Sequence, residues 1–476
     1  MSFPAAACHR LPAPTAAGLA LPAPTTATLT SSPASSLLSS QLEDEGVGTG
    51  ACAARPAPGG AEGADGAALG NYASNPSAGA AAAGEQGQDE VLAARLRRAE
   101  RWSLLTSARK VTGLSRLRAC RKVTVTGEGG PAMRHGHRRG AGYSGLSTCA
   151  SVWVCPCCMA RIAARRAEQL ATVMAMVRMT GGTAYMVTFT VRHHRGHRLA
   201  SVWDAVTAGW SAVTSGGQWQ DDGSGLLGWA RVVEATHTPA NGWHLHVHAL
   251  FCWAGEVDDA EAQRVAFRAW ARWDRALRRK GFDSTPTRGV DARRVRFGGD
   301  GADDGIGEYF TKLAREVTAG YAKDSRSGRS PLAILRDAVE TYRVEDLELW
   351  WEWEAGSYGR RQLTWSTGAR DLRTLAGVRE QTDEEIAMEE IGDEDEITFS
   401  REAWREVTRT GQESFLLDLA ETGGMAAVTA WLDERGLGWS PARRAPRRDG
   451  PRPRSPQTRR EARAVLGVEG QSWSTV

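Results

Sequence analysis

The stretch Asn241-Gly-Trp-His-Leu-His-Val-His-Ala-Leu-Phe251 alternates polar and apolar side chains over most of its length. In a β-strand successive side chains point to opposite faces, so His244, His246 and His248 share one face. Three adjacent imidazoles are unfavourable in an apolar core, because each needs a hydrogen-bond partner and each opposes protonation of the others. A divalent metal ion resolves the conflict, since neutral imidazole is a good ligand. The stretch therefore predicts a metal-binding strand; the alternative is the solvent-facing side of an edge strand.

The residues around this strand predict an α+β fold. β-branched and aromatic residues predict strands, and apolar residues at helical spacing predict helices. Pro239, Asn241 and Gly242 provide the hairpin chemistry that would join the second and third strands. The order strand, helix, strand, strand, helix, strand, helix indicates a central, mainly antiparallel sheet flanked by helices. The expected strands are 183–192, 227–236, 243–253 and 290–297, and the expected helices are 91–107, 159–178, 199–213, 258–280 and 306–317.

Glu234 is a candidate third ligand of the predicted metal. It lies on the strand before the hairpin, and a short hairpin brings it beside the histidines. A carboxylate there would complete a site for a hard metal or orient a ligand imidazole. The alternative is an exposed strand carboxylate. His237 is a weaker candidate because it lies near the turn.

A compact group of cysteines predicts a second, structural metal site. Cys155 and Cys158 have the two-residue spacing of a zinc knuckle, and Cys149 adds a third thiol. Cys120 is the expected fourth ligand of Zn²⁺, with Cys157, His135 and His137 as alternatives. Unpaired thiols or a redox switch are the other interpretations. Such a module would present Arg165 and Arg166 to DNA phosphates.

The chain of 476 residues has a net charge of only +3, which conceals separated blocks of charge. Residues 383–396 contain nine carboxylates, and residues 443–463 contain nine arginines. Separated blocks suit a protein with a polyanionic partner, although the acidic block by itself is expected only to solubilise the chain. No run of about 18 apolar residues is present, so we expect no membrane span and a cytoplasmic protein.

The string Gly242-Trp-His-Leu-His-Val-His-Ala-Leu-Phe251 resembles the histidine signature of the HUH endonuclease superfamily, in its branch of plasmid rolling-circle replication initiators from high-GC bacteria. Val187-Thr-Phe-Thr-Val191 resembles the upstream strand of that family. The resemblance implies a ferredoxin/RRM-like sheet and a nicking-site Mg²⁺ or Mn²⁺ held by His246 and His248. His244 falls where relatives often carry another polar residue or a histidine.

Gly305-Ile-Gly-Glu-Tyr-Phe-Thr-Lys312 resembles the third signature of the family, a tyrosine followed three residues later by lysine. The resemblance implies that Tyr309 attacks a DNA phosphodiester and that Lys312 stabilises the charge. Tyr321, which is also near a lysine, is the second candidate. Glu308 is a candidate for activating water at termination, although some relatives carry a glutamate four residues before the tyrosine, where this chain has Gly305.

These features predict five regions. Residues 1–90 form a disordered Ala/Pro/Gly-rich leader, and residues 441–476 a disordered Arg/Pro-rich tail. Between them lie a zinc-binding, DNA-contacting module (91–180), the nicking domain (181–325) and a helical, Trp-rich region (326–440).

The implied function is initiation of plasmid replication. The protein would bind a double-strand origin, nick one strand, leave a 5′-phosphotyrosine and a 3′-OH primer, and rejoin the strand at termination. Host helicase and polymerase are possible partners. The alternatives are a relaxase or transposase with the same chemistry, and a non-enzymatic zinc-containing DNA-binding regulator. A metallohydrolase for small molecules is disfavoured, because it explains neither the Arg-rich tail nor the tyrosine segment.

Overall fold

The computed structural model describes residues 85–125, 130–136, 140–296, 328–390 and 394–442. All of them belong to the second of two units of the chain, Ala64–Val476. Several predicted features lie outside the described residues: nearly all of the leader and the tail, the helix 306–317, His137, Glu308, Tyr309, Lys312 and Tyr321.

A five-stranded antiparallel sheet forms the centre of the described fold, with the strand order β6-β3-β5-β4-β7. The hairpin of β4 and β5 turns at Gly242, whose φ of +74° is readily adopted by glycine. The predicted α+β fold with an antiparallel central sheet is confirmed. The strands are β3 (Thr183–Thr190), β4 (Leu226–Thr238), β5 (Gly242–Trp253), β6 (Val290–Arg294) and β7 (Leu363–Trp365).

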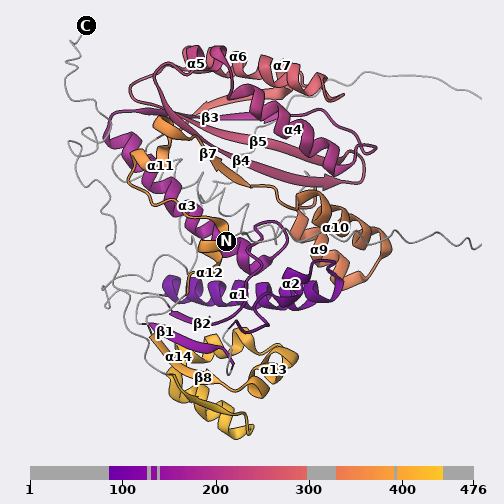
Figure 1. The fold of residues 1–476 in the computed structure, drawn as a ribbon, viewed down its shortest axis with the longest axis vertical. Coiled ribbons are helices and arrows are strands. Elements are labelled where there is room, and N and C mark those ends of the chain that lie inside the picture. The colour runs from indigo at the N-terminus through magenta and orange to yellow at the C-terminus, as the bar shows by residue number, and fades with distance from the viewer. Residues whose placement is uncertain (1–84, 126–129, 137–139, 297–327, 391–393, 443–476) are drawn as a thin grey trace, which may run out of the picture. The chain divides into compact units, whose positions relative to one another are not determined.

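One face of this sheet is covered by α4 (Leu199–Val213) and α6 (Asp259–Arg278), as Figure 1 shows. The Asp258 side chain caps the start of α6 by accepting a hydrogen bond from the Glu261 backbone N–H. Basic residues in the last turn of α6 complement the helix dipole. The short helices α5 (Gly217–Asp222) and α7 (Pro286–Gly289) lie next to α6. The apolar residues of β5, from Trp243 to Trp253 at every second position, point into this core.

The other face is partly covered by α3 (Pro156–Met179) and the short helix α11 (Leu372–Leu375). Apolar side chains of α3, including Val173 and Val177, form a cluster with Leu250 and Cys252 of β5. His244, His246 and His248 share this face, but they are not members of the apolar cluster among the described residues. The face is therefore apolar at one end of β5 and carries histidines at the other.

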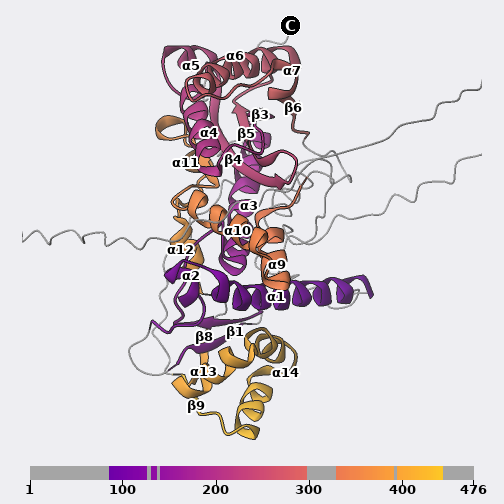
Figure 2. The ribbon, with the colours of Figure 1, turned by 90° about the vertical axis from the view of Figure 1, so that its right-hand side faces the viewer.

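A second, four-stranded sheet combines segments from distant parts of the chain, in the order β2-β1-β8-β9. No strand was expected in the zinc-binding module (91–180), but β1 (Ala132–Gly136) and β2 (Gly140–Ser144) lie within it. β1 pairs with β8 (Glu394–Phe399), which in turn pairs with β9 (Trp439–Pro441). Figure 2 shows this sheet together with α1 (Glu85–Val111), α13 (Arg401–Thr410) and α14 (Glu413–Glu434).

The Trp-rich segment that follows residue 328 forms α9 (Pro331–Thr341) and α10 (Val344–Ser357). These helices contact both the five-stranded sheet and its helices on one side and α1 on the other. Trp353 stacks on Trp243 of β5 with ring centroids 5.2 Å apart. The region 326–440 was expected to be helical, whereas its residues Leu363–Trp365 form the edge strand β7. The remaining short elements are α2 (Ser115–Ala119), the 3₁₀ helix η1 (Gly368–Arg370) and α12 (Asp383–Met388).

Among the described residues, no helix is both long enough and apolar enough to cross a membrane.

Arg98 of α1 is a largely buried cation that joins α1 to α14. It donates to Glu421 at 2.7 and 2.6 Å and also to Asp418, and its side chain is 13% exposed. Removing one partner of a buried ion pair leaves charge uncompensated, so we expect Arg98→Met to lower the free energy of unfolding by about 3 kcal/mol. Urea unfolding measures this loss. Arg409→Met is the control, because that side chain is 70% exposed in its pair with Glu406 and no measurable change is expected.

Candidate functional site

Glu234, His246 and His248 form a three-residue group on one face of the central sheet. Glu234 of β4 lies directly opposite His246 of β5, and Val232 lies opposite His248. Glu234 Oε2 accepts hydrogen bonds from Nε2 of His246 at 2.9 Å and from Nε2 of His248 at 3.1 Å. The antiparallel register therefore directs both imidazoles toward one carboxylate.

The electrostatics of this group favour a negative carboxylate between the two imidazoles. Burial would raise the pKa of Glu234, but the hydrogen bonds from His246 and His248, together with their electrostatic interaction with the carboxylate, outweigh burial and hold it well below its usual range. The three side chains are 15–29% exposed, so the group can be reached from solvent. Two imidazole nitrogens and one carboxylate suit a divalent ion such as Mn²⁺.

The spacing of the ligand atoms also fits such an ion. Two ligands at right angles, each about 2.1 Å from an octahedral ion, lie about 3 Å apart. The separations of 2.9 and 3.1 Å from the Glu234 oxygen match this value. The donor set and its spacing are therefore compatible with Mg²⁺ or Mn²⁺.

His244 shares the face but lies outside the three-residue group. Its Nδ1 is 2.7 Å from Nε2 of His193, whose Nδ1 is 3.0 Å from the carbonyl oxygen of Asn241. Burial, and then electrostatic interaction with His246, lowers the pKa of His244 to about 4, so the ring is neutral near pH 7. The Asn241 carbonyl can only accept a hydrogen bond, so the proton of a neutral His193 lies on Nδ1. Nε2 of His193 then accepts a hydrogen bond from Nδ1 of His244. This leaves Nε2 of His244 unprotonated.

His237 lies on the opposite face of β4 from Glu234, because the two are an odd number of residues apart. Its ring contacts Trp243, with centroids 5.0 Å apart. The structure thus places this weaker candidate away from the metal face. His193 was not among the predicted residues, although its position just after the predicted strand 183–192 was a usable signal.

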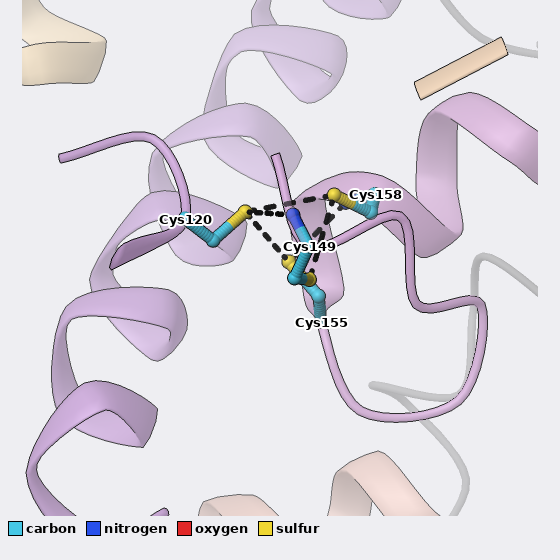
Figure 3. Close-up of side chains that lie close together, drawn as sticks. All are labelled: Cys120, Cys149, Cys155 and Cys158. Carbon is cyan, nitrogen blue, oxygen red and sulfur yellow. Dashed lines mark hydrogen bonds between the residues drawn. The ribbon is translucent and has the colours of Figure 1, made fainter. Parts of the chain in front are cut away.

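Cys120, Cys149, Cys155 and Cys158 form a buried group whose sulfur atoms all lie within 4.8 Å of one another. Figure 3 shows the four side chains converging on a common centre. Cys120 follows α2, Cys149 follows β2, and Cys155 and Cys158 lie at the start of α3. The structure thus brings together the three cysteines that the spacing indicated and Cys120, the first candidate for the fourth ligand.

The geometry of the four thiols fits a tetrahedral zinc ion. Sγ of Cys120 is 3.7 Å from that of Cys155 and 3.6 Å from that of Cys158, and Sγ of Cys149 is 3.8 Å from that of Cys158. A tetrahedral site with Zn–S distances near 2.3 Å requires sulfur separations of about 3.8 Å. Hydrogen bonds from the other three thiols hold the pKa of Cys158 well below its usual range, whereas burial and hydrogen bonds within the group hold the pKa of Cys155 well above it.

The alternative fourth ligands within the described residues lie elsewhere. Sγ of Cys157 is 3.7 Å from the carbonyl oxygen of Arg101, and Cys157 is not part of the thiol group. His135 lies on β1, with its Nδ1 3.7 Å from the Glu396 carboxylate.

Arg165 and Arg166, the predicted DNA contacts, both bond to other parts of the chain. Arg165 donates to Gln381 and Glu168, and its side chain is 38% exposed. Arg166 donates to the Gln381 carbonyl and to Asp383 at 2.9 Å, and its side chain is only 13% exposed. Their contact with DNA stays a prediction, for which Arg165 is the more accessible of the two.

Comparison with known proteins connects these sites to a family. The sequence model of a family described as "Replication protein" matches residues 145–413. This range contains the Glu234 group and three of the four cysteines.

Two proteins of Streptomyces are similar to the chain in sequence. The chain is 27% identical over 335 residues to "Protein rep" of Streptomyces lividans, which covers 56% of this chain and 73% of that protein. It is 28% identical over 140 residues to "Neomycin resistance protein" of Streptomyces cyanogenus, which covers 24% of this chain and 32% of that protein. No solved structure matches. The family match spans more than half of the chain and confirms the predicted resemblance: the chain belongs to the family of replication proteins.

Proposed function

We propose that this protein initiates rolling-circle replication of a plasmid by nicking one strand at the double-strand origin. The observation that carries the proposal is the group of Glu234, His246 and His248 on one sheet face, in a chain of the replication protein family. The protein would act in the cytoplasm, where a bacterial plasmid, host helicase and host polymerase are found. This group is the feature that distinguishes a nicking enzyme from a regulator that only binds DNA.

Glu234, His246 and His248 would hold Mg²⁺ or Mn²⁺. When bound, the ion supplies positive charge that stabilises and positions the phosphate oxygens. The phenol oxygen of Tyr309 forms a bond to phosphorus, and the bond from phosphorus to the 3′ oxygen breaks. That oxygen takes up a proton and becomes the 3′-OH primer. Lys312 would stabilise negative charge, and Glu308 would activate water at termination; these three assignments rest on the family resemblance.

The four-cysteine group would hold a structural Zn²⁺ that fixes the start of α3 relative to α2 and the segment after β2. Burial of all four thiols supports a closed structural site rather than a catalytic one. In the proposed complex, the first half of α3 would lie near duplex DNA, with Arg165 contacting phosphate.

The test of this function is covalent capture. The full-length protein is incubated with single-stranded oligonucleotides that tile the plasmid origin, with Mn²⁺ or Mg²⁺, and the products are separated on a denaturing gel. We expect a covalent adduct between the protein and the 5′ phosphate of the fragment downstream of the nick, and we expect EDTA to abolish it. We expect His248→Ala to reduce the adduct by roughly 100-fold through lost metal binding.

His237→Ala is the matched control, because His237 lies on the opposite face of the same hairpin and should leave the adduct unchanged. Specific origin binding with no adduct under any metal would contradict the nicking function and favour a DNA-binding regulator. An adduct formed at a transfer origin or a transposon end instead would favour a relaxase or a transposase.

A further inference from the structure

Thr188 contacts the side of His248 that faces away from Glu234. The two residues lie directly opposite each other on β3 and β5, and Thr188 Oγ1 is 3.0 Å from Nδ1 of His248. The other ring nitrogen of His248, Nε2, is bonded to Glu234. The imidazole is thus held at both nitrogens, by a hydroxyl on one neighbouring strand and a carboxylate on the other.

The neighbouring pair of opposed residues on the same two strands, Thr190 and His246, lacks this arrangement. Thr190 lies directly opposite His246, yet its hydroxyl donates to the carbonyl oxygen of Arg288 at 2.6 Å. Nδ1 of His246 is buried and has no hydrogen-bond partner within the described part of the chain. Two threonines on the same strand and the same face therefore have different partners, and only Thr188 reaches a histidine of the Glu234 group.

We propose that Thr188 is a positioning residue that keeps Nε2 of His248 directed toward the metal. This inference rests on the proposed metal site of Glu234, His246 and His248. A histidine that ligates a metal generally donates its other ring N–H to a fixed partner, which sets the tautomer and the ring orientation. Thr188 is that partner for His248. This assignment gives a physical role to the first of the two threonines that alternate with apolar residues in Val187–Val191.

A hydroxyl suits this position because it both donates and accepts. Without an ion, Nε2 of His248 donates to the Glu234 carboxylate, so Nδ1 accepts from the Thr188 hydroxyl. With an ion, the lone pair of Nε2 faces the metal, so Nδ1 carries the proton and donates to Oγ1. Thr188 therefore supports the ring in both states, whereas a valine of the same shape supports neither.

The experiment measures Mn²⁺ binding to the full-length protein by isothermal titration calorimetry, which does not depend on nicking. Loss of an outer partner typically weakens metal binding by about 10–100-fold, and we expect Thr188→Val to fall in this range. Thr188→Ser, which restores the hydroxyl, is expected to recover affinity to within about threefold of the wild type. Thr190→Val is the matched control and should bind Mn²⁺ like the wild type.

Thermal unfolding without Mn²⁺ separates positioning from general loss of structure. Each valine variant loses one hydrogen bond, worth about 1 kcal/mol, so Thr188→Val and Thr190→Val should lose similar stability and differ only in Mn²⁺ affinity. Equal Mn²⁺ affinity of the two variants would overturn the role of Thr188. His248→Ala tests the site itself: if it binds Mn²⁺ like the wild type, the metal site and the role of Thr188 are both overturned. If His248→Ala abolishes binding and Thr188→Val does not weaken it, only the role of Thr188 fails.

Discussion

Replacing Cys155 with serine is expected to remove zinc from the protein and unfold the region around the start of α3. Cys155 caps α3, and its sulfur lies in the buried group with Cys120, Cys149 and Cys158. A structural zinc site contributes about 10–16 kcal/mol of binding free energy directly to folding. Serine is a poor ligand for zinc, so the site loses a donor that no described neighbour replaces.

The measurements are zinc content after dialysis and the midpoint of thermal unfolding. We expect about one zinc ion per wild-type chain, and none in the Cys155→Ser variant. We also expect the unfolding midpoint to fall by roughly 10 °C or more. Chelation of the wild type at neutral pH should reproduce the same loss.

Cys157→Ser is the matched control, because Cys157 lies in the same short motif but its sulfur contacts the Arg101 carbonyl rather than the other thiols. This variant should keep its zinc and most of its stability. Zinc lost from Cys157→Ser but kept by Cys155→Ser would contradict the ligand set. A wild-type protein purified without zinc, and unable to bind it, would contradict the site as a whole.

Local sequence patterns were sufficient to predict the sheet that carries the histidines. Apolar residues at period two predict which face of β5 is buried, and the short turn before Gly242 limits how β4 and β5 can align. Once that register is set, Glu234 must lie opposite His246, as the structure shows. Three of the cysteines were indicated by local spacing, because Cys155 and Cys158 share a knuckle and Cys149 is near them in sequence. Cys120 is 29 residues before Cys149 and was one of four candidates for the fourth position.

Contacts between distant segments could not be predicted in this way. The second sheet pairs β1 with β8, which lies more than 250 residues later, and neither short strand has a strong local signal. β7 has only three residues and forms a strand because the edge of β4 is available. Arg166 seemed available for DNA from its sequence neighbours, but its partners Gln381 and Asp383 come from a distant segment.

Thr188 and Thr190 show the same limit at the candidate site. Alternation places both hydroxyls on the histidine face, so sequence alone treats the two residues as equivalent. The Arg288 carbonyl makes the difference, since it engages Thr190 and leaves Thr188 as the hydroxyl that reaches an imidazole. Which side chain supports a ligand therefore depends on a neighbour from outside the motif.

Replacing Tyr309 with phenylalanine is expected to abolish the covalent adduct with origin DNA while leaving origin binding intact. The change removes only the phenol oxygen, which is the atom proposed to bond to phosphorus. Loss of a nucleophile commonly reduces turnover by several orders of magnitude, so we expect a fall on the order of a thousandfold or more. Nicking of supercoiled origin plasmid, adduct formation and a filter-binding or mobility-shift assay measure the three properties separately.

Tyr321→Phe is the matched variant, because Tyr321 is the other tyrosine near a lysine in the same segment. It should nick and form the adduct like the wild type. The reverse result, with Tyr321→Phe inactive and Tyr309→Phe active, would assign the nucleophile to Tyr321 and leave the role of the Glu234 group unchanged. If the variant with both tyrosines replaced by phenylalanine still nicks without forming an adduct, while His248→Ala does not nick, the attacking group is a metal-activated water, since an ion at the Glu234 group could generate such a nucleophile itself.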